Sequence, residues 1–219
     1  MENCFIIAVD GTAASGKGTL AEKLAAHYKF DYLDTGKIYR TAGFHALQQN
    51  IDFQNISAIL ECIKSLDFSE MTALELDTEE IGRAASQLGA IPEVREALNK
   101  AQRDFAIGKN GIIVDGRDIG TIIFPNADIK LYVTATPEIR AERRFKQLQN
   151  LGKEVIYDDV LRDLRERDER DSNRKVAPLK PALDALHIDS TLLDQISVLE
   201  LVITLTQGAI NERFMSKCA

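Results

Sequence analysis

The stretch Gly11-Thr12-Ala13-Ala14-Ser15-Gly16-Lys17-Gly18-Thr19 decides the fold of this chain. An apolar run, residues 4–10, precedes it, and apolar residues at helical spacing follow it. This order predicts a strand, a phosphate-binding loop and the start of a helix. In such a loop the backbone N–H groups turn toward phosphate oxygens, the helix start adds partial positive charge, and Lys17 reaches the outer phosphates. We therefore expect all nine residues to bind a nucleoside triphosphate, ATP or GTP.

Position 18 separates this loop from those of switch GTPases. In the usual motif Ser or Thr follows the lysine directly and supplies a hydroxyl to Mg²⁺, whereas here Gly18 follows it and Thr19 comes one residue later. We therefore expect Mg²⁺ to be held through water and phosphate oxygens rather than by a dedicated protein site. The Lys-Gly-Thr variant favours phosphoryl transferases that act on small molecules.

The composition limits the classes of partner. With 219 residues, 45% of them hydrophobic, the chain is expected to form one compact core with insertions. A net charge of −7 argues against binding nucleic acid, because the phosphate backbone requires a basic surface. No apolar run approaches the ~20 residues that span a bilayer, so no membrane partner is expected.

The cysteines and the start of the sequence indicate in which cellular compartment the protein is expected. Cys4, Cys62 and Cys218 are odd in number, far apart and without the spacing of metal ligands, which is typical of reduced thiols. The first strand begins almost at the N-terminus, with no basic leader before it. We therefore expect the protein in the cytoplasm.

Short apolar runs alternate with helical patterns along the rest of the chain. The further strand candidates are residues 30–33, 112–115, 129–133 and 186–189. The helical patterns cover residues 20–28, 41–49, 55–65, 79–88, 94–105, 137–150, 158–172 and 194–214. Before the second of these, Asp34-Thr35-Gly36 introduces helical sequence that contains Tyr39 and Arg40. This alternation predicts an α/β fold with a central parallel sheet and helices on both faces. In such folds ligands bind at the carboxyl ends of the strands.

Three further segments carry arginines beside hydroxyls or carboxylates: Asp34–Arg40, Asp115–Thr121 and Arg167–Arg174. In the third segment, Arg167, Arg170, Asp171 and Arg174 have helical spacing, so a helix would line them on one face. A row of guanidiniums there would neutralise the charge of a transferring phosphoryl group. A run of alternating charges is also typical of a solvated helix, so the segment alone leaves both interpretations open.

Two more segments, Ala84-Ala85-Ser86-Gln87 and Pro92–Leu98, lie between the first and second arginine segments. The phosphate loop and these five segments, in their order along the chain, resemble those of bacterial cytidylate kinases. The likeness spans nearly the whole chain. It implies a P-loop kinase fold in one domain, residues 1–219, with a monophosphate-binding insertion at about 38–106 and a helical lid at about 145–163. It also implies a monomer that transfers the γ-phosphoryl group of ATP to CMP or dCMP, giving CDP or dCDP and ADP.

The resemblance assigns roles to individual residues. It places the acceptor phosphate on Thr35, Arg40, Arg117 and Arg174. It places the cytosine edge on Ser86, Arg95 and Asp118, and the sugar on Arg167 and Asp171. The residues expected to act in catalysis are Lys17, Arg40, Arg117, Arg170 and Arg174. Cytosine presents an amine donor beside two acceptors, so a carboxylate can accept from the amine while an arginine donates to the other side.

Other functions remain open at this stage. A kinase for UMP, AMP or dTMP would share the loop and the arginines. A nucleotide-dependent switch is disfavoured by Gly18 and by the lack of an Asn-Lys-x-Asp guanine signature, and an inert structural domain would leave three arginine clusters without a purpose. Two departures from the family are visible: Lys37 stands where a small residue is more usual, and the stretch at 66–77 is compact. Members commonly carry an arginine near Leu76-Asp77-Thr78, and this chain has none there.

Overall fold

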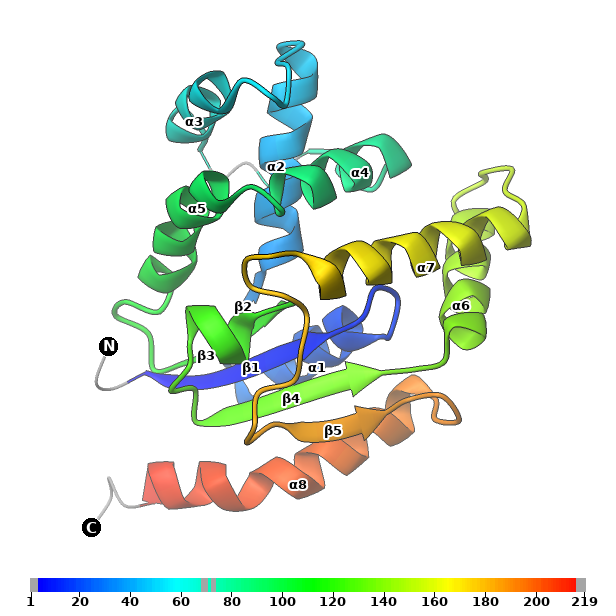
Figure 1. Cartoon of the computed structure of the whole chain (residues 1–219). Coiled ribbons are helices and arrows are strands. Elements are labelled where there is room, and N and C mark those ends of the chain that lie inside the picture. Colours follow the sequence, from blue (N-terminus) through cyan, green and yellow to red (C-terminus); the bar gives the residue numbers. More distant parts are fainter. Residues whose placement is uncertain (1–3, 68–70, 72–73, 216–219) are drawn as a thin grey trace.

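A parallel sheet forms the centre of the molecule (Figure 1). The computed structural model describes residues 4–67, 71 and 74–215. Within these residues the sheet has five strands in the order β2-β3-β1-β4-β5, all parallel. The strands are β1 (Phe5–Gly11), β2 (Asp31–Asp34), β3 (Gly111–Gly116), β4 (Ile129–Thr134) and β5 (Leu186–Asp189). The α/β fold predicted from the alternating patterns is confirmed.

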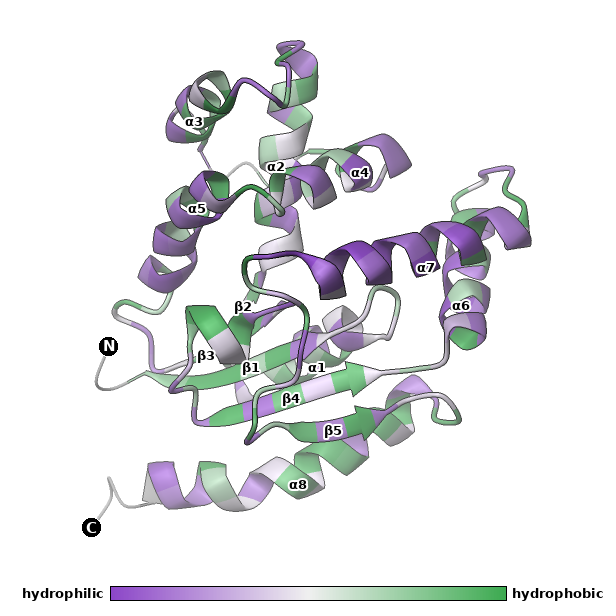
Figure 2. Ribbon diagram, viewed as in Figure 1, coloured by the Kyte–Doolittle hydropathy of each residue, from purple (hydrophilic) through white to green (hydrophobic). Residues whose placement is uncertain are grey.

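Helices cover both faces of the sheet, because its central strands are apolar on both sides. Every residue of β1 and β3 is buried. One face packs against α1 (Lys17–Tyr28) and α8 (Gln195–Met215). On the other face α2 (Thr35–Gln48) packs against β3, and α5 (Pro92–Asp104) packs against the turn after it. The helices α3 (Ile56–Lys64) and α4 (Glu79–Leu88) pack on α5 and α2 and extend the same apolar cluster away from the sheet (Figure 1). Figure 2 shows the hydrophobic residues gathered on the central strands.

Two further helices stand over the carboxyl ends of the strands. These are α6 (Pro137–Asn150) and α7 (Tyr157–Asn173), and α7 is the most hydrophilic element in view in Figure 2. A small apolar cluster joins both helices to the loop that follows β1, through Ala13, Ala141, Val160 and Leu164. The mostly polar α7 is therefore anchored by one narrow apolar stripe, which leaves its other faces free for charged contacts.

A short π-helical turn, η2 (Ile119–Ile123), follows β3 and has no counterpart among the predicted elements. Its wide hydrogen bonds include Phe124 N–H donating to the Ile119 carbonyl at 2.7 Å. A π-helical turn has no periodic sequence signature, and such turns occur often at functional sites. Here it is fixed by burial of Ile119 and Ile123 in the core.

The described residues also bear on the expectations for cysteines and membranes. Cys4 and Cys62 are free thiols, and burial raises the pKa of both. Cys218 and residues 68–70 and 72–73 lie outside the described residues. Among the helices that are described, none combines the length and apolar character of a membrane-spanning segment.

The closest approach between two strands gives a stability prediction. A Cβ on Gly11 would lie 2.0 Å from the Val133 carbonyl oxygen of β4, and the Gly11 φ is +153°. We expect Gly11→Ala to lower the free energy of unfolding by about 3 kcal/mol in urea titrations, because backbone must move. Gly208→Ala is the control, since a Cβ there meets nothing within 4 Å. That helical substitution should raise stability by about 0.5–1 kcal/mol, and equal effects of the two variants would contradict this account.

Candidate active site

The loop after β1 has the backbone geometry of an anion site. Ala14 and Gly16 both have positive φ, +58° and +89°, which turns the chain sharply before α1. Gly16 is the N-cap of α1 and provides no side-chain acceptor, so the first-turn amides of the helix have no cap. These free N–H groups, together with the partial positive charge of a helix N-terminus, favour phosphate at this place.

The larger of two adjoining cavities, about 580 Å³, opens beside this loop. Its floor is the loop and the first turn of α1, and its walls come from α6 and from the chain between β5 and α8. The lining residues are Ala14, Ser15, Gly16, Lys17, Gly18, Thr19, Leu20, Arg143, Arg144, Gln147, Ser190, Leu193, Asp194, Gln195 and Val198. The cavity is therefore large enough for a nucleoside next to the phosphate loop.

Arg143 joins the two walls of the larger cavity. Its guanidinium donates to the Ser190 hydroxyl at 2.9 Å and to the Ser190 carbonyl at 2.6 Å. The Ser190 hydroxyl lies 2.9 Å from the Ser15 carbonyl oxygen of the loop. The wall after β5 is thus fixed to both α6 and the phosphate loop. Sequence reasoning missed Arg143 and Ser190, although the pair Arg143-Arg144 in the middle of a helix that follows a strand was a usable signal.

Arg140 fixes the phosphate loop from the side of α6. It is buried, and it donates to the carbonyls of Ala13 at 3.1 Å and Ala135 at 2.9 Å. Its third partner is Asp168 of α7, at 2.6 Å. One guanidinium therefore holds the loop, the start of α6 and the middle of α7 together. Nothing in the sequence pattern distinguished Arg140 from a surface cation.

The smaller cavity, about 240 Å³, contains all nine residues predicted to bind the acceptor. Among the described residues its lining holds six cations and four carboxylates, an excess of two positive charges in a chain of net charge −7. The charged lining residues are Lys17, Arg40, Arg95, Arg117, Arg167, Arg174, Asp34, Asp115, Asp118 and Asp171. Thr35, Tyr39 and Ser86 also line it. The two cavities share Ala14, Lys17 and Gly18.

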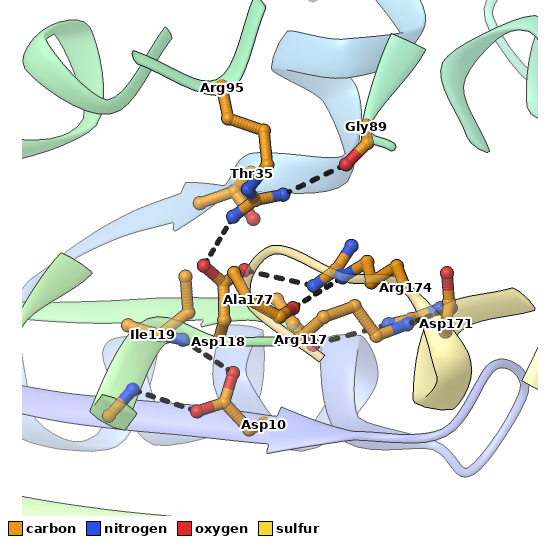
Figure 3. A network of polar contacts seen from close by, with 12 residues as sticks. Asp10, Thr35, Gly89, Arg95, Arg117, Asp118, Ile119, Asp171, Arg174 and Ala177 are labelled. Carbon is orange, nitrogen blue, oxygen red and sulfur yellow. Dashed lines mark hydrogen bonds and ion pairs between the residues drawn. The ribbon is translucent and has the colours of Figure 1, made fainter. Parts of the chain in front are cut away.

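Asp118 lies at the centre of a buried polar network (Figure 3). Arg95 of α5 donates to one of its carboxylate oxygens and to the Gly89 carbonyl. Arg174, just after α7, lies 3.4 Å from the other oxygen. A carboxylate between two guanidiniums has its charge compensated, so the network fixes all three side chains relative to one another.

A second ion pair joins β3 to α7. Arg117 Nε donates to Asp171 Oδ2 at 2.9 Å, and Arg167 Nε is 4.0 Å from the same oxygen. Burial raises the pKa of Asp171, but the charges of Arg117 and Arg167 outweigh it and hold the pKa below its ordinary value. Burial and neighbouring guanidiniums lower the pKa of Arg167 to about 10, so it stays charged at neutral pH.

Lys17 contacts a carboxylate that the sequence analysis did not single out as a site residue. Lys17 Nζ lies 3.8 Å from Asp115 Oδ2, and the Tyr32 hydroxyl donates to Asp115 Oδ1 at 2.9 Å. Burial and the nearby Arg117 lower the pKa of Lys17, while burial raises that of Asp115. A Cβ on Gly18 would lie 3.6 Å from both Asp115 Oδ2 and the Tyr32 hydroxyl. The space that a Ser or Thr would use at position 18 therefore faces a tyrosine and a carboxylate.

Two hydroxyls of the smaller cavity differ in their availability. The Thr35 hydroxyl donates to the Asp115 carbonyl of β3 at 2.7 Å, so its hydrogen is already used in a bond within the protein. The buried Ser86 hydroxyl of α4 has no partner among the described residues. A buried hydroxyl that lines a cavity without a partner is available to a ligand.

The expectation that one helical face carries Arg167, Arg170, Asp171 and Arg174 needs correction. Only Arg167 and Asp171 face the smaller cavity from within α7, because Arg174 follows the last helical residue and reaches the cavity from extended backbone. Arg170 is exposed, lies 3.8 Å from Glu166 and lines neither cavity. Its catalytic role stays a prediction.

Comparisons with known proteins agree with this geometry. The sequence pattern of the family described as "Cytidylate kinase" matches residues 7–208. The cytidylate kinase of Rhodospirillum rubrum is 50% identical over 191 residues, which cover 85% of this chain and 90% of that protein. That of Paramagnetospirillum magneticum is 50% identical over 192 residues, covering 86% and 91%. The chain belongs to the cytidylate kinase family. It is a nucleoside-monophosphate kinase, and the predicted activity is confirmed at the level of the family.

Solved structures of low sequence identity agree with the fold of this cytidylate kinase. A gluconokinase from Sinorhizobium meliloti superimposes with a TM-score of 0.52 at 13% identity, covering 97% of each chain. An uncharacterized protein from Eubacterium ventriosum gives a TM-score of 0.53 at 15% identity, covering 93% of this chain and 98% of its own. At these identities the likeness concerns the fold alone.

The departure near position 77 gives a prediction about the acceptor phosphate. Arg40, predicted to bind that phosphate, instead pairs with Asp77 at 2.7 Å, and Asp77 is largely exposed. Because the carboxylate competes with a phosphate for the same guanidinium, we expect Asp77→Asn to lower the KM for CMP about threefold, with kcat unchanged. Steady-state kinetics at saturating ATP measure both.

The matched control for Asp77→Asn is Glu79→Gln. Glu79 also forms an exposed ion pair, 2.7 Å from Arg83, but neither residue lines a cavity. This variant should leave the KM for CMP unchanged. A KM for CMP that rises in Asp77→Asn would show that the carboxylate orients Arg40 for the substrate rather than competing with it.

Proposed function

We propose that this cytidylate kinase transfers the γ-phosphoryl group of ATP to the phosphate of CMP or dCMP, giving CDP or dCDP and ADP. One observation carries the proposal. The two cavities meet at Lys17, so a triphosphate in the larger cavity and a monophosphate in the smaller one would bring their phosphates together at one lysine. This is the arrangement that in-line transfer between two bound nucleotides requires.

The charge of the smaller cavity supports a monophosphate acceptor. A nucleoside monophosphate is close to a dianion at neutral pH, and the described lining carries an excess of two positive charges. We assign its phosphate to Arg40, Arg117 and Arg174, with Thr35 beside them, and its sugar to Arg167 and Asp171. A guanidinium binds a phosphate bidentately, so several of them fix its orientation as well as its charge.

The network around Asp118 supports cytosine as the base. The carboxylate would accept from the exocyclic amine, while Arg95 donates to the acceptor side of the ring and the unpartnered Ser86 hydroxyl supplies a further contact. Uracil carries a carbonyl where cytosine has the amine, so two acceptors would face each other. A buried acceptor left without a donor costs roughly 1–3 kcal/mol, which is enough to exclude uridine nucleotides from efficient turnover.

Catalysis then needs no nucleophile from the protein. The acceptor phosphate attacks directly, and Lys17 with the loop amides stabilises charge on the donor phosphates. Water must be excluded, because it would compete as an acceptor. We assign this to a lid at about residues 145–163, joining α6 and α7, which closes over the bound nucleotides.

The residues near Lys17 fit Mg²⁺ held through water. Among the described residues no group of three or more His, Cys, Asp or Glu side chains forms a metal site. Asp115 and Asp34 nevertheless line the smaller cavity beside Lys17, and carboxylates suit the hydration shell of Mg²⁺. When bound, the ion neutralises charge on the transferring phosphates. We also propose a monomer of one domain, acting in the cytoplasm, in keeping with the sequence analysis.

A coupled assay of ADP formation tests the proposal. Mg·ATP is offered with CMP, dCMP, UMP, AMP or dTMP separately, and Lys17→Ala serves as the control for contaminating kinases. We expect rapid turnover with CMP and dCMP only. Preference for another monophosphate would retain the reaction and refute the base assignment, whereas ATP hydrolysis without any acceptor dependence would refute phosphoryl transfer to a nucleotide.

Replacing Asp118, the residue proposed to recognise cytosine, should change the preference for CMP over UMP. Asp118→Asn places an amide donor where cytosine also presents a donor, and where uracil presents an acceptor. We expect the ratio of kcat/KM for CMP to that for UMP to fall at least tenfold. Asp184→Asn is the control, because this exposed carboxylate pairs with Lys130 at 2.9 Å and lines neither cavity. An unchanged ratio of the two kcat/KM values in Asp118→Asn would show that Asp118 does not take part in base recognition.

A further inference from the structure

A buried carboxylate joins the phosphate-loop strand to the turn that carries Asp118. Asp10, in β1 directly before the loop, is 4% exposed. Its Oδ1 accepts from the Ile119 N–H and its Oδ2 from the Gly120 N–H, both at 2.8 Å (Figure 3). Those amides belong to the first two residues of η2, immediately after Asp118. The Asp10 side chain therefore binds two successive backbone amides of this turn.

The arrangement is costly, which argues for a purpose beyond filling space. Burial raises the pKa of Asp10 to about 6, against the opposing effect of the two amide bonds. An apolar side chain at this central strand position would avoid that cost, but it would leave two buried N–H groups without an acceptor. A carboxylate is also the side chain whose two oxygens both accept, so it alone matches two adjacent donors.

The contacts continue from this turn to the proposed base site. The Asp118 carbonyl accepts from the Ile122 and Ile123 N–H groups at 2.9 and 3.2 Å, so Asp118 is part of the turn that Asp10 holds. Its carboxylate then pairs with Arg95 and Arg174. Asp10, Ile119, Asp118 and Arg95 are all buried along this path, and protein interiors transmit displacement because they are close-packed.

We propose that Asp10 is a positioning residue for base recognition. Its carboxylate fixes the turn bearing Asp118 relative to the phosphate-binding loop, and so sets the distance between the donor phosphates and the acceptor base. The inference rests on the proposed function, because it assumes that Asp118 reads cytosine. It assigns the selection of the acceptor base partly to a residue of the donor-side strand that touches neither nucleotide.

Asp10→Asn tests this inference with little change in shape. The amide keeps one acceptor oxygen and turns an NH₂ group toward the second N–H, so one of the two bonds is replaced by a clash of donors. CMP and UMP are supplied together at low concentration with Mg·ATP, and CDP and UDP are separated and quantified. Competition gives the ratio of the two kcat/KM values, and this ratio does not depend on how much of the variant is folded.

The matched control is Asp128→Asn. The Asp128 carboxylate also accepts a backbone N–H of β1, from Ile6 at 2.8 Å, but at the end of the strand away from both cavities. We expect Asp10→Asn to lower the CMP-to-UMP ratio about tenfold and raise the KM for CMP, while the KM for ATP stays within about twofold. Asp128→Asn should keep the ratio of the unmodified enzyme.

Several results would overturn the inference. An unchanged ratio in Asp10→Asn, even with a lower rate, would leave Asp10 a purely structural residue. Loss of all product both in this variant and in the smaller Asp10→Ser, with unfolding seen by circular dichroism, would lead to the same conclusion. An unmodified enzyme without preference for CMP would refute the proposed function itself. That failure is distinguished from failure of the Asp10 inference because the unmodified enzyme is measured before any variant.

Discussion

The parallel hydrogen bonding of β1 to both β3 and β4 is the constraint on which the rest of the structure depends. Because all strands of the described sheet run the same way, their carboxyl ends meet at one edge. The phosphate loop, the Asp115–Asp118 turn, the start of α2 and the segment after β5 are brought together there. Neither cavity could exist with one of these strands reversed, since its wall would move to the opposite edge of the sheet.

Charged groups at this edge are held in place by other groups of the protein. Arg117 is held by Asp171, Arg95 by Asp118 and the Gly89 carbonyl, and Arg140 by three separate acceptors. Burying these ions costs free energy, which their pairing offsets. What remains is a set of guanidiniums that need little reorganisation when phosphate arrives, and low reorganisation is the main source of electrostatic catalysis.

The sequence predicted what local patterns encode. The loop from Gly11 to Thr19 and the alternating elements sufficed for the fold, and the resemblance to cytidylate kinases supplied nine of the residues that line the smaller cavity. Contacts between distant positions were missed. Asp10 lies 109 residues before Ile119, and Ala13 lies 127 residues before Arg140, so no periodicity links them. Arg170 illustrates the opposite failure, because helical spacing says which residues share a face but not which face meets the cavity.

The C-terminal half of α7 is connected both to the phosphate loop and to the smaller cavity. Asp168 pairs with Arg140, which binds the phosphate loop, and Asp171, three residues later, pairs with Arg117 of the smaller cavity. A tilt of α7 about its narrow apolar anchor shifts both carboxylates at once. A nucleotide that displaced α7 at one cavity would therefore also move a side chain at the other, and by thermodynamic reciprocity each nucleotide would then alter the affinity of the other by the same factor. The helix thus provides a structural connection between the two cavities that needs no direct contact between the nucleosides.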